Sequence, residues 1–147
     1  MKDRILNDLK DAMKNKDKER LAVIRLVKGS IQMTELDKKR ELTDDEVIDV
    51  ISKEIKSRKD SIKEFEKGSR DDLINKTQEE IDILMEYLPK QMTNEEIEET
   101  IDKVFDIVKP TSQKDMGKIM KEINPLVRGK ADMGLVSKIV KEKISNI

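Results

Sequence analysis

The chain has 147 residues, enough for one domain of ordinary size or two small ones, and its net charge at neutral pH is −1. Charged residues make up 43% and aromatic residues 2%, while the 35% of apolar residues recur at helical spacing, which predicts a folded, nearly all-helical protein. Because Cys and His are both absent, disulfides, thiolate nucleophiles, Cys/His zinc sites and a histidine general base are excluded.

No stretch approaches the roughly 18 consecutive apolar residues that a membrane span needs. The first residues, Met1 to Asp8, lack the apolar core of a secretory signal. We therefore expect a cytoplasmic protein with no membrane partner.

The N-terminal half, residues 1–88, is predicted to contain four helices. The first runs from Lys2 to about Asn15. The second runs from about Asp17 to Leu36 and carries a broad apolar stripe, so we expect it to be touched from more than one side. Gly29 lies inside it, where a glycine costs about 1 kcal/mol relative to alanine. We expect this glycine to allow close packing of another helix.

Capping signals delimit the third and fourth helices. Residues 43–46 read Thr-Asp-Asp-Glu, a capping box that starts the third helix, which Gly68 ends. Residues 69–72 start the fourth helix. Pro89 ends it, because the residue before a proline, Leu88, is pushed out of the helical region.

A proline hinge at residues 89–92 is predicted to join the two halves. Tyr87 lies next to it, and we expect this residue to brace the hinge rather than take part in chemistry. The C-terminal half, residues 93–147, is predicted to form three helices. The predicted fold is therefore all-α, with a four-helix half joined at Pro89 to a three-helix half.

Sequence signals also predict where the C-terminal helices begin and end. Thr93 and Glu96 form a second capping box, and Ser112 is placed to cap the helix that follows it. Pro125 is predicted to kink or end that helix, because it lacks an N–H and clashes one turn back. Asp132 is predicted to cap the last helix.

The sixth predicted helix separates apolar from basic residues. Met116, Ile119, Met120 and Ile123 fall on one face at about 100° per residue, and the opposite face carries lysines. The basic residues of this region are Lys114, Lys118, Lys121, Arg128 and Lys130. Residues 109–147 hold nine Lys/Arg against four Asp/Glu, a net charge of +5. This pattern indicates either a surface that binds a polyanion or an ordinary solvated helix face.

Two glycines and one aspartate frame this basic region. Gly117 is interpreted as a site of helix packing, with close approach of a nucleic-acid backbone as the alternative. Gly129 is predicted to end its helix in the left-handed conformation. Asp132 would occupy the N–H groups of the following helix and repel phosphate, so Lys130 is the better candidate contact.

Several segments together resemble the YqeY family, essentially from end to end. They are residues 58–61, 65–68, 70–73, 87–91, 115–118 and 129–132. That family is similar to the C-terminal tail of the B subunit of the tRNA-dependent amidotransferase, which converts Glu-tRNA(Gln) or Asp-tRNA(Asn) to the amidated form. The resemblance implies a helical fold whose tail-like half contacts tRNA, while catalysis lies in other domains and another subunit.

The predicted function is therefore a tRNA-binding accessory module without a catalytic centre, metal or cofactor of its own. The predicted RNA contacts are the five basic residues named above, and the expected partners are tRNA or a tRNA-handling complex, not DNA. Releasing ammonia from glutamine needs an activated nucleophile, and Cys is absent. In addition, no Gly-rich loop is present to hold ATP phosphates. Two alternatives stay open: a helical protein–protein adaptor, and carbon–nitrogen ligase activity with glutamine as amide donor within a complex.

Overall fold

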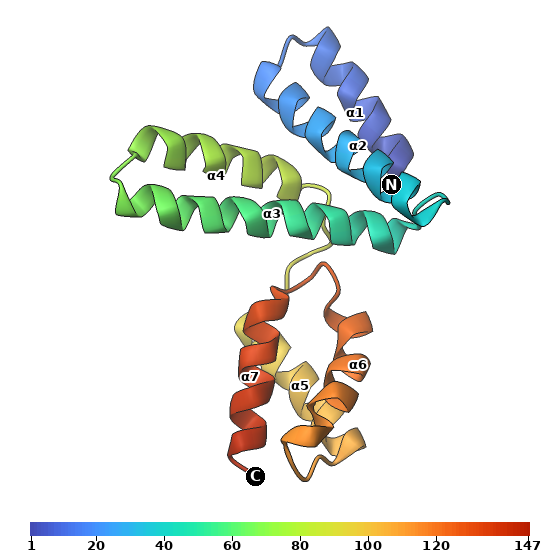
Figure 1. The fold of residues 1–147 in the computed structure, drawn as a ribbon, viewed down its shortest axis with the longest axis vertical. Coiled ribbons are helices and arrows are strands. Elements are labelled where there is room, and N and C mark those ends of the chain that lie inside the picture. Colours follow the sequence, from blue (N-terminus) through green and yellow to red (C-terminus); the bar gives the residue numbers. More distant parts are fainter. The chain divides into compact units, whose positions relative to one another are not determined.

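The computed structural model describes all residues from Met1 to Ile147 and consists of helices without strands, so the predicted all-α fold is confirmed (Figure 1). The helices in chain order are α1 (Lys2–Lys14), α2 (Lys18–Lys38), α3 (Asp44–Lys67), α4 (Asp71–Met85), α5 (Asn94–Val108), the short 3-10 helix η1 (Gln113–Asp115), α6 (Met116–Val127) and α7 (Met133–Ser145). The chain divides into two compact units, Met1–Leu88 and Pro89–Ile147, and each unit has its own apolar core.

The first unit consists of two helical hairpins, α1 with α2 and α3 with α4 (Figure 1). Their apolar stripes meet in a core whose most deeply buried large side chains are Ile24, Ile51 and Leu84. The predicted capping box at the start of α3 is confirmed. The Glu46 N–H donates to Thr43 Oγ1 at 3.3 Å, and the Thr43 N–H donates to Glu46 Oε1 at 3.1 Å.

The fourth helix ends earlier than predicted. α4 stops at Met85, and the N–H groups of Glu86, Tyr87 and Leu88 each donate to the carbonyl three residues back. Such bonds tighten the chain into a 3-10-like turn and satisfy the last carbonyls of the helix. The prediction that Pro89 ends the helix was therefore wrong, because the chain tightens into this turn before it reaches Leu88 and Pro89.

The interpretation of Gly29 as a packing site for another helix of the chain was also wrong. A Cβ atom added at Gly29 would meet no other atom within 4 Å. Glycine has no side chain whose polarity could indicate whether its side of a helix is buried. The position of Gly29 in the helical pattern therefore did not distinguish a packed site from an open one.

In the second unit, α5, α6 and α7 bury one face each around Ile101, Ile123 and Val136, all of which are fully buried. The predicted caps are present. Thr93 and Glu96 form the second capping box of the chain, and Asp132 Oδ1 accepts from the Gly134 N–H at 2.9 Å. Hydrogen bonds of this kind fix where each helix begins.

Pro125 does not end its helix, since α6 continues to Val127. The residue is exposed. The carbonyl one turn back, at Lys121, therefore loses its N–H donor on the solvent side of the helix, where water can replace the missing bond. Pro125 was predicted to kink or to end its helix, and the structure excludes the second of these, an end of the helix at that residue.

Candidate nucleic-acid interface

Helix α6 has one buried and one solvated face. Ile119 and Ile123 are fully buried in the core of the second unit. Lys114, which lies in η1, and Lys118 and Lys121 on α6 are all exposed. With a rise of about 1.5 Å per residue, the three lysines form a row roughly 10 Å long on the side of the helix away from the core.

The start of this row is held in place by local hydrogen bonds. The Thr111 N–H donates to Asp115 Oδ2 at 2.8 Å, and this bond holds the pKa of the Asp115 carboxyl below its ordinary value. Gln113 Nε2 donates to Ser145 Oγ on α7 at 3.2 Å. Lys114 therefore projects from a backbone segment that is tied both to the preceding loop and to the last turn of α7.

The loop between α6 and α7 places Lys130. Gly129 adopts the left-handed conformation with φ 71°, as predicted, and is buried. Its carbonyl accepts from Gln91 Nε2 at 2.7 Å, and the Lys130 carbonyl accepts from the Met92 N–H at 2.8 Å. The segment after Pro89 thus packs against this loop within the second unit and leaves the Lys130 side chain exposed.

The N-terminal end of α7 is occupied by a carboxylate. Asp132 accepts from the Gly134 N–H, and Asp132 itself is exposed. A phosphate at this helix end would meet a negative charge. Within this loop the Lys130 side chain is therefore the group that suits an anion.

Few of the predicted contact residues are neutralised by ion pairs. Lys118 has one carboxylate oxygen, Asp115 Oδ1, at 3.9 Å, and its side chain is 77% exposed. Lys114, Lys121 and Lys130 make no salt bridge. Arg128 is exposed and has interactions of its own, so the case for an anion-binding surface rests on the four lysines.

Charge is distributed unevenly over the second unit. Residues 113–130 contain five basic and two acidic residues, whereas α5 contains six acidic residues and one lysine. The six acidic residues of α5, all exposed, are Glu95, Glu96, Glu98, Glu99, Asp102 and Asp106. One ion pair, between Lys143 and Asp102, joins α7 to α5. The α6 side of the unit is therefore positive and the outer face of α5 negative.

Gly117 does not serve the packing role that its position suggested. It is exposed, and a Cβ atom added there would meet no other atom within 4 Å. The packing interpretation was therefore wrong. The glycine leaves the backbone accessible beside Lys118 and Lys121, so approach of a nucleic-acid backbone remains a prediction.

Tyr87 belongs to the core of the first unit, where it is 4% exposed. Its hydroxyl donates to the carboxylate of Asp8 on α1, and the Arg4 guanidinium lies 4.7 Å from the ring centroid. Burial and the bond to Asp8 raise the pKa of the Tyr87 hydroxyl above its ordinary value. These contacts fasten α1 to the turn after α4, and the hydroxyl is not available for chemistry. Pro89, two residues further on, is half-buried, and its carbonyl accepts from Gln91 Nε2 at 3.0 Å.

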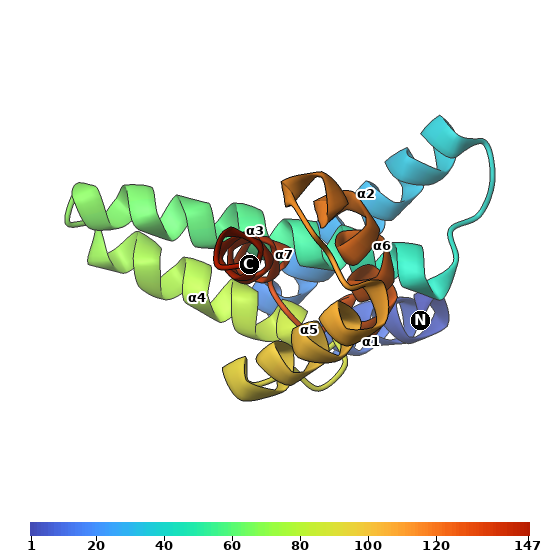
Figure 2. The ribbon, with the colours of Figure 1, turned by 90° about the horizontal axis from the view of Figure 1, so that it is seen from below.

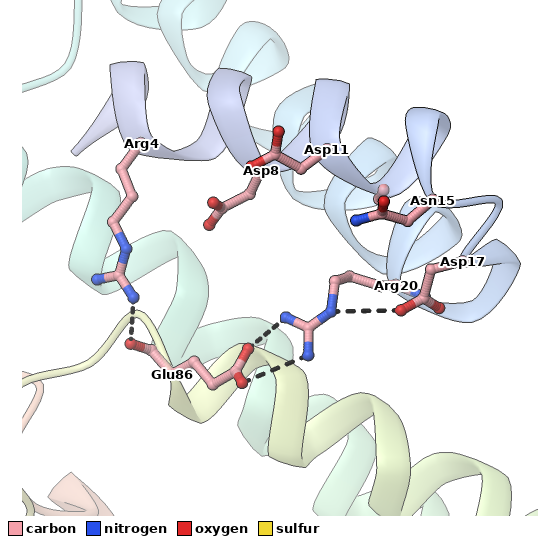
Figure 3. A pocket seen from close by; sticks show the side chains of 8 residues that line it. Arg4, Asp8, Asp11, Asn15, Asp17, Arg20 and Glu86 are labelled. Atoms are coloured by element: carbon pink, nitrogen blue, oxygen red, sulfur yellow. Dashed lines mark hydrogen bonds and ion pairs between the residues drawn. The ribbon is translucent and has the colours of Figure 1, made fainter.

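The first unit also contains a polar pocket of about 570 Å³ that the sequence did not predict (Figure 3). It is lined by Arg4, Asp8, Asp11, Ala12, Asn15, Asp17, Arg20 and Glu86. Arg20 forms an ion pair with Glu86, and Arg4 Nη2 donates to the Glu86 carbonyl at 2.9 Å. Both arginines of the pocket are bound to protein oxygens, and these contacts join α1 and α2 to the end of α4. No local pattern signals contacts between residues 66 and 82 positions apart.

None of the helices combines the length and the apolar character needed to span a bilayer. No group of three or more acidic side chains is arranged to hold a metal ion.

Three related proteins bear the name "Altered inheritance of mitochondria protein 41, mitochondrial". The protein from Pyrenophora tritici-repentis is 31% identical over 144 residues, which cover 96% of this chain and 79% of the relative. The protein from Saccharomyces cerevisiae is 37% identical over 105 residues, which cover 69% of this chain and 57% of the relative. The protein from Kluyveromyces lactis is 47% identical over 81 residues, or 54% of this chain and 44% of the relative. The aligned part thus spans about half the length of the two yeast relatives.

The family model described as Yqey-like protein matches residues 2–144, nearly the whole chain. Together with the fungal relative at 31% identity over 96% of the chain, this match establishes the family. The chain belongs to the YqeY family.

Proposed function

We propose that this protein is a tRNA-binding accessory module without a catalytic centre of its own. Its contact surface consists of Lys114, Lys118, Lys121 and Lys130, with Arg128 beside them. The observation that carries the proposal is a row of exposed lysines with little or no ion pairing, displayed on the solvated side of a firmly packed helix. Unpaired cations at fixed spacing suit the regularly spaced phosphates of a nucleic acid.

The aromatic residues favour recognition of the RNA backbone rather than of unpaired bases. Tyr87 is buried in the first unit, and Phe105 is half-buried against the core of the second. The third aromatic residue, Phe65, is half-buried on α3 of the first unit and is not part of the unit that carries the lysine row. No exposed aromatic ring is therefore present to stack on a splayed base, which is the usual way to bind single-stranded RNA. A folded duplex region of a tRNA, read by its phosphates and shape, fits this surface better.

The resemblance to the amidotransferase tail supplies tRNA as the candidate polyanion. In this proposal the protein assists a tRNA-handling complex and leaves catalysis to other subunits. A cytoplasmic location belongs to the same proposal, because tRNA is aminoacylated and used in translation in the cytoplasm. The mitochondrial location in the relatives' names applies to those proteins.

The experiment is binding of the full chain to total tRNA over a salt series. If the four lysines neutralise about four phosphates, log K falls with log salt with a slope of about −3.5. Changing Lys114, Lys118 and Lys121 together to Glu should lower affinity by about 100-fold or more at roughly 0.1 M salt, and reduce the slope by about 3 units.

A matched control comes from α3, which also carries three exposed lysines, Lys56, Lys59 and Lys63, on one face. That helix holds eight acidic and six basic residues, so its own net charge is −2. The same triple change to Glu on α3 should alter affinity by less than about 3-fold. Absence of binding at low salt, or equal losses in both variants, would refute the proposal, and circular dichroism verifies that both variants are folded.

A further inference from the structure

Helix α2 carries apolar residues on two opposite faces. The face toward the core of the first unit buries Val23, Ile24, Val27 and Ile31. A second row, here named the α2 seam, consists of Ala22, Leu26, Gly29, Met33 and Leu36. The spacing of these five residues alternates between four and three, as at the a and d positions of a coiled coil. At about 100° per residue, the seam lies on the side of the helix away from that core.

The α2 seam is open to solvent. The exposed fractions are 55% for Leu26, 69% for Met33 and 76% for Leu36. At Gly29, midway along the seam, an added Cβ atom would meet nothing within 4 Å. Figure 2 shows the C-terminal turns of α2 projecting beyond α3. A continuous exposed apolar row is a feature that soluble proteins normally reserve for an interaction.

We propose that the α2 seam binds the α2 seam of a second copy of this chain, with the two helices antiparallel. A two-fold axis placed between Gly29 and Met33 makes the contact self-complementary. Each Met33 then packs over the partner's Gly29, where the missing side chain leaves a notch. Leu26 of each copy meets the partner's Leu36.

The charges beside the seam fit the antiparallel arrangement. The residues that flank its centre, Ser30 and Gln32, are uncharged, so the two-fold axis brings no like charges together there. Arg25 comes to lie near the C-terminal turn of the partner's α2, where the helix dipole and the exposed Asp37 favour a cation and the exposed Lys39 opposes it. Lys38 and Arg40 at the same end are paired with Glu46 of their own chain. A parallel pair would instead place glycine opposite glycine and align the two helix dipoles side by side, both of which are less favourable.

The size of the seam sets the expected strength of the dimer. The seam is roughly 21 Å long and about 10 Å wide, which gives a footprint of about 200 Å² per copy. This is about a quarter of the roughly 800 Å² per partner in a standard interface. We therefore expect a weak, reversible dimer with a Kd of about 0.1–1 mM.

The first test is sedimentation equilibrium of the full chain from about 10 µM to about 1 mM. The wild type should approach twice the monomer mass, and Met33→Glu should stay monomeric. Ile107→Glu is the matched control, since Ile107 is 77% exposed on α5 outside the seam, and it should associate like the wild type. A wild type that is monomeric at all concentrations, or a Met33→Glu variant that still dimerises, would overturn the proposal and leave the face to another partner.

A second variant tests the notch. Gly29→Ala should weaken association by about 5-fold or more, because its methyl group occupies the space assigned to the partner's Met33. The same change should not harm the monomer, since alanine is the better helix residue and the site is open. Unchanged or tighter association would contradict the predicted contact.

Orientation can be read from disulfides, because the chain contains no cysteine. In the antiparallel dimer a Leu26→Cys chain and a Leu36→Cys chain face each other, within the Cα separation of about 4.4–6.8 Å that a disulfide needs. Mild oxidation should therefore cross-link an equimolar mixture of the two variants but neither variant alone. Cross-linking of either single variant by itself would overturn the antiparallel arrangement.

Discussion

The two units use positive charge in different ways. In the first unit, arginines bind carboxylates of neighbouring helices: Arg58 Nε lies 3.0 Å from Glu80 Oε2, and Arg20 is paired with Glu86. In the second unit, Lys114 and Lys121 face solvent without a salt bridge. The chemistry of the two side chains suits this division, because guanidinium forms a rigid fork of donors whereas lysine carries a mobile point charge.

The difference follows from the thin cores of this protein. With 2% aromatic residues, the cores are built from aliphatic side chains, with Tyr87 the one buried aromatic residue. The first unit supplements its core with polar links between helices. Positive charge that already holds helices together is not available to a ligand. Exposed lysines that hold nothing together are the better candidates for binding, and each prediction below tests this contrast.

The largest expected effect on stability is at Tyr87. Tyr87→Phe removes the donor to Asp8 and leaves that carboxylate unpaired beside the core, which should lower the free energy of unfolding by about 2 kcal/mol. Urea denaturation measures the loss. The additional change Asp8→Asn should recover part of it, because an uncharged side chain is less costly to leave unpaired; a loss below about 0.5 kcal/mol would show that the polar link is not structural.

A slightly smaller effect is expected at Gly129. Its φ of 71° is unfavourable for a residue with a Cβ, so Gly129→Ala should destabilise the second unit by about 1–2 kcal/mol. Gly117→Ala, on the preceding helix α6, is the control, since it introduces its methyl group into open space. Thermal unfolding should show a lower Tm for the first variant and an equal or higher Tm for the second. Equal losses would mean that Gly129 is not conformationally required.

Acid should weaken the first unit through Glu46. Hydrogen bonds from Arg40, Lys38 and the Thr43 N–H hold the pKa of the Glu46 carboxyl below its ordinary value. Because the folded pKa is the lower one, this contribution is complete above the unfolded pKa, about 4.3, and is lost as pH falls through the folded pKa.

Urea denaturation between about pH 6 and 2 should therefore show a shallower decline in stability for Glu46→Gln than for the wild type. Glu98→Gln, at an exposed position on α5, is the control and should keep the wild-type profile. Parallel profiles for wild type and Glu46→Gln would contradict the predicted role.

The smallest effect on stability is expected for the lysine row. Changing Lys114, Lys118 and Lys121 together to Gln should alter the free energy of unfolding by less than about 0.5 kcal/mol, because the row supports no other element. Urea denaturation beside a tRNA-binding measurement separates the two roles. A loss of more than about 2 kcal/mol would remove the contrast between the two units.

Much of the fold could be predicted because its signals are local. The capping boxes at Thr43 and Thr93 involve residues three apart, and the stripe at Ile119 and Ile123 follows from helical periodicity. The left-handed turn at Gly129 likewise depends on a single residue type.

What could not be predicted depends on distant residues or on which side of a helix is covered. The pocket around Arg20 and Glu86 joins segments far apart in the chain. Gly29 and Gly117 were assigned packing partners that the structure does not provide. The exposure of Lys114 and Lys121 was predictable from periodicity, but their lack of salt bridges needed three-dimensional positions.

The opposite charges of α5 and α6 have a kinetic consequence. The chain as a whole has a net charge of −1 and exerts little long-range attraction on a polyanion. Within a Debye length of about 8 Å at physiological salt, however, the acidic face of α5 repels a phosphate backbone and the lysine row attracts it. Encounters of a phosphate backbone with the acidic face of α5 would therefore be short-lived, whereas encounters with the lysine row would be prolonged. In the proposed binding to tRNA, the charge asymmetry of this one small unit would set both the rate and the direction of capture before any hydrogen bond forms.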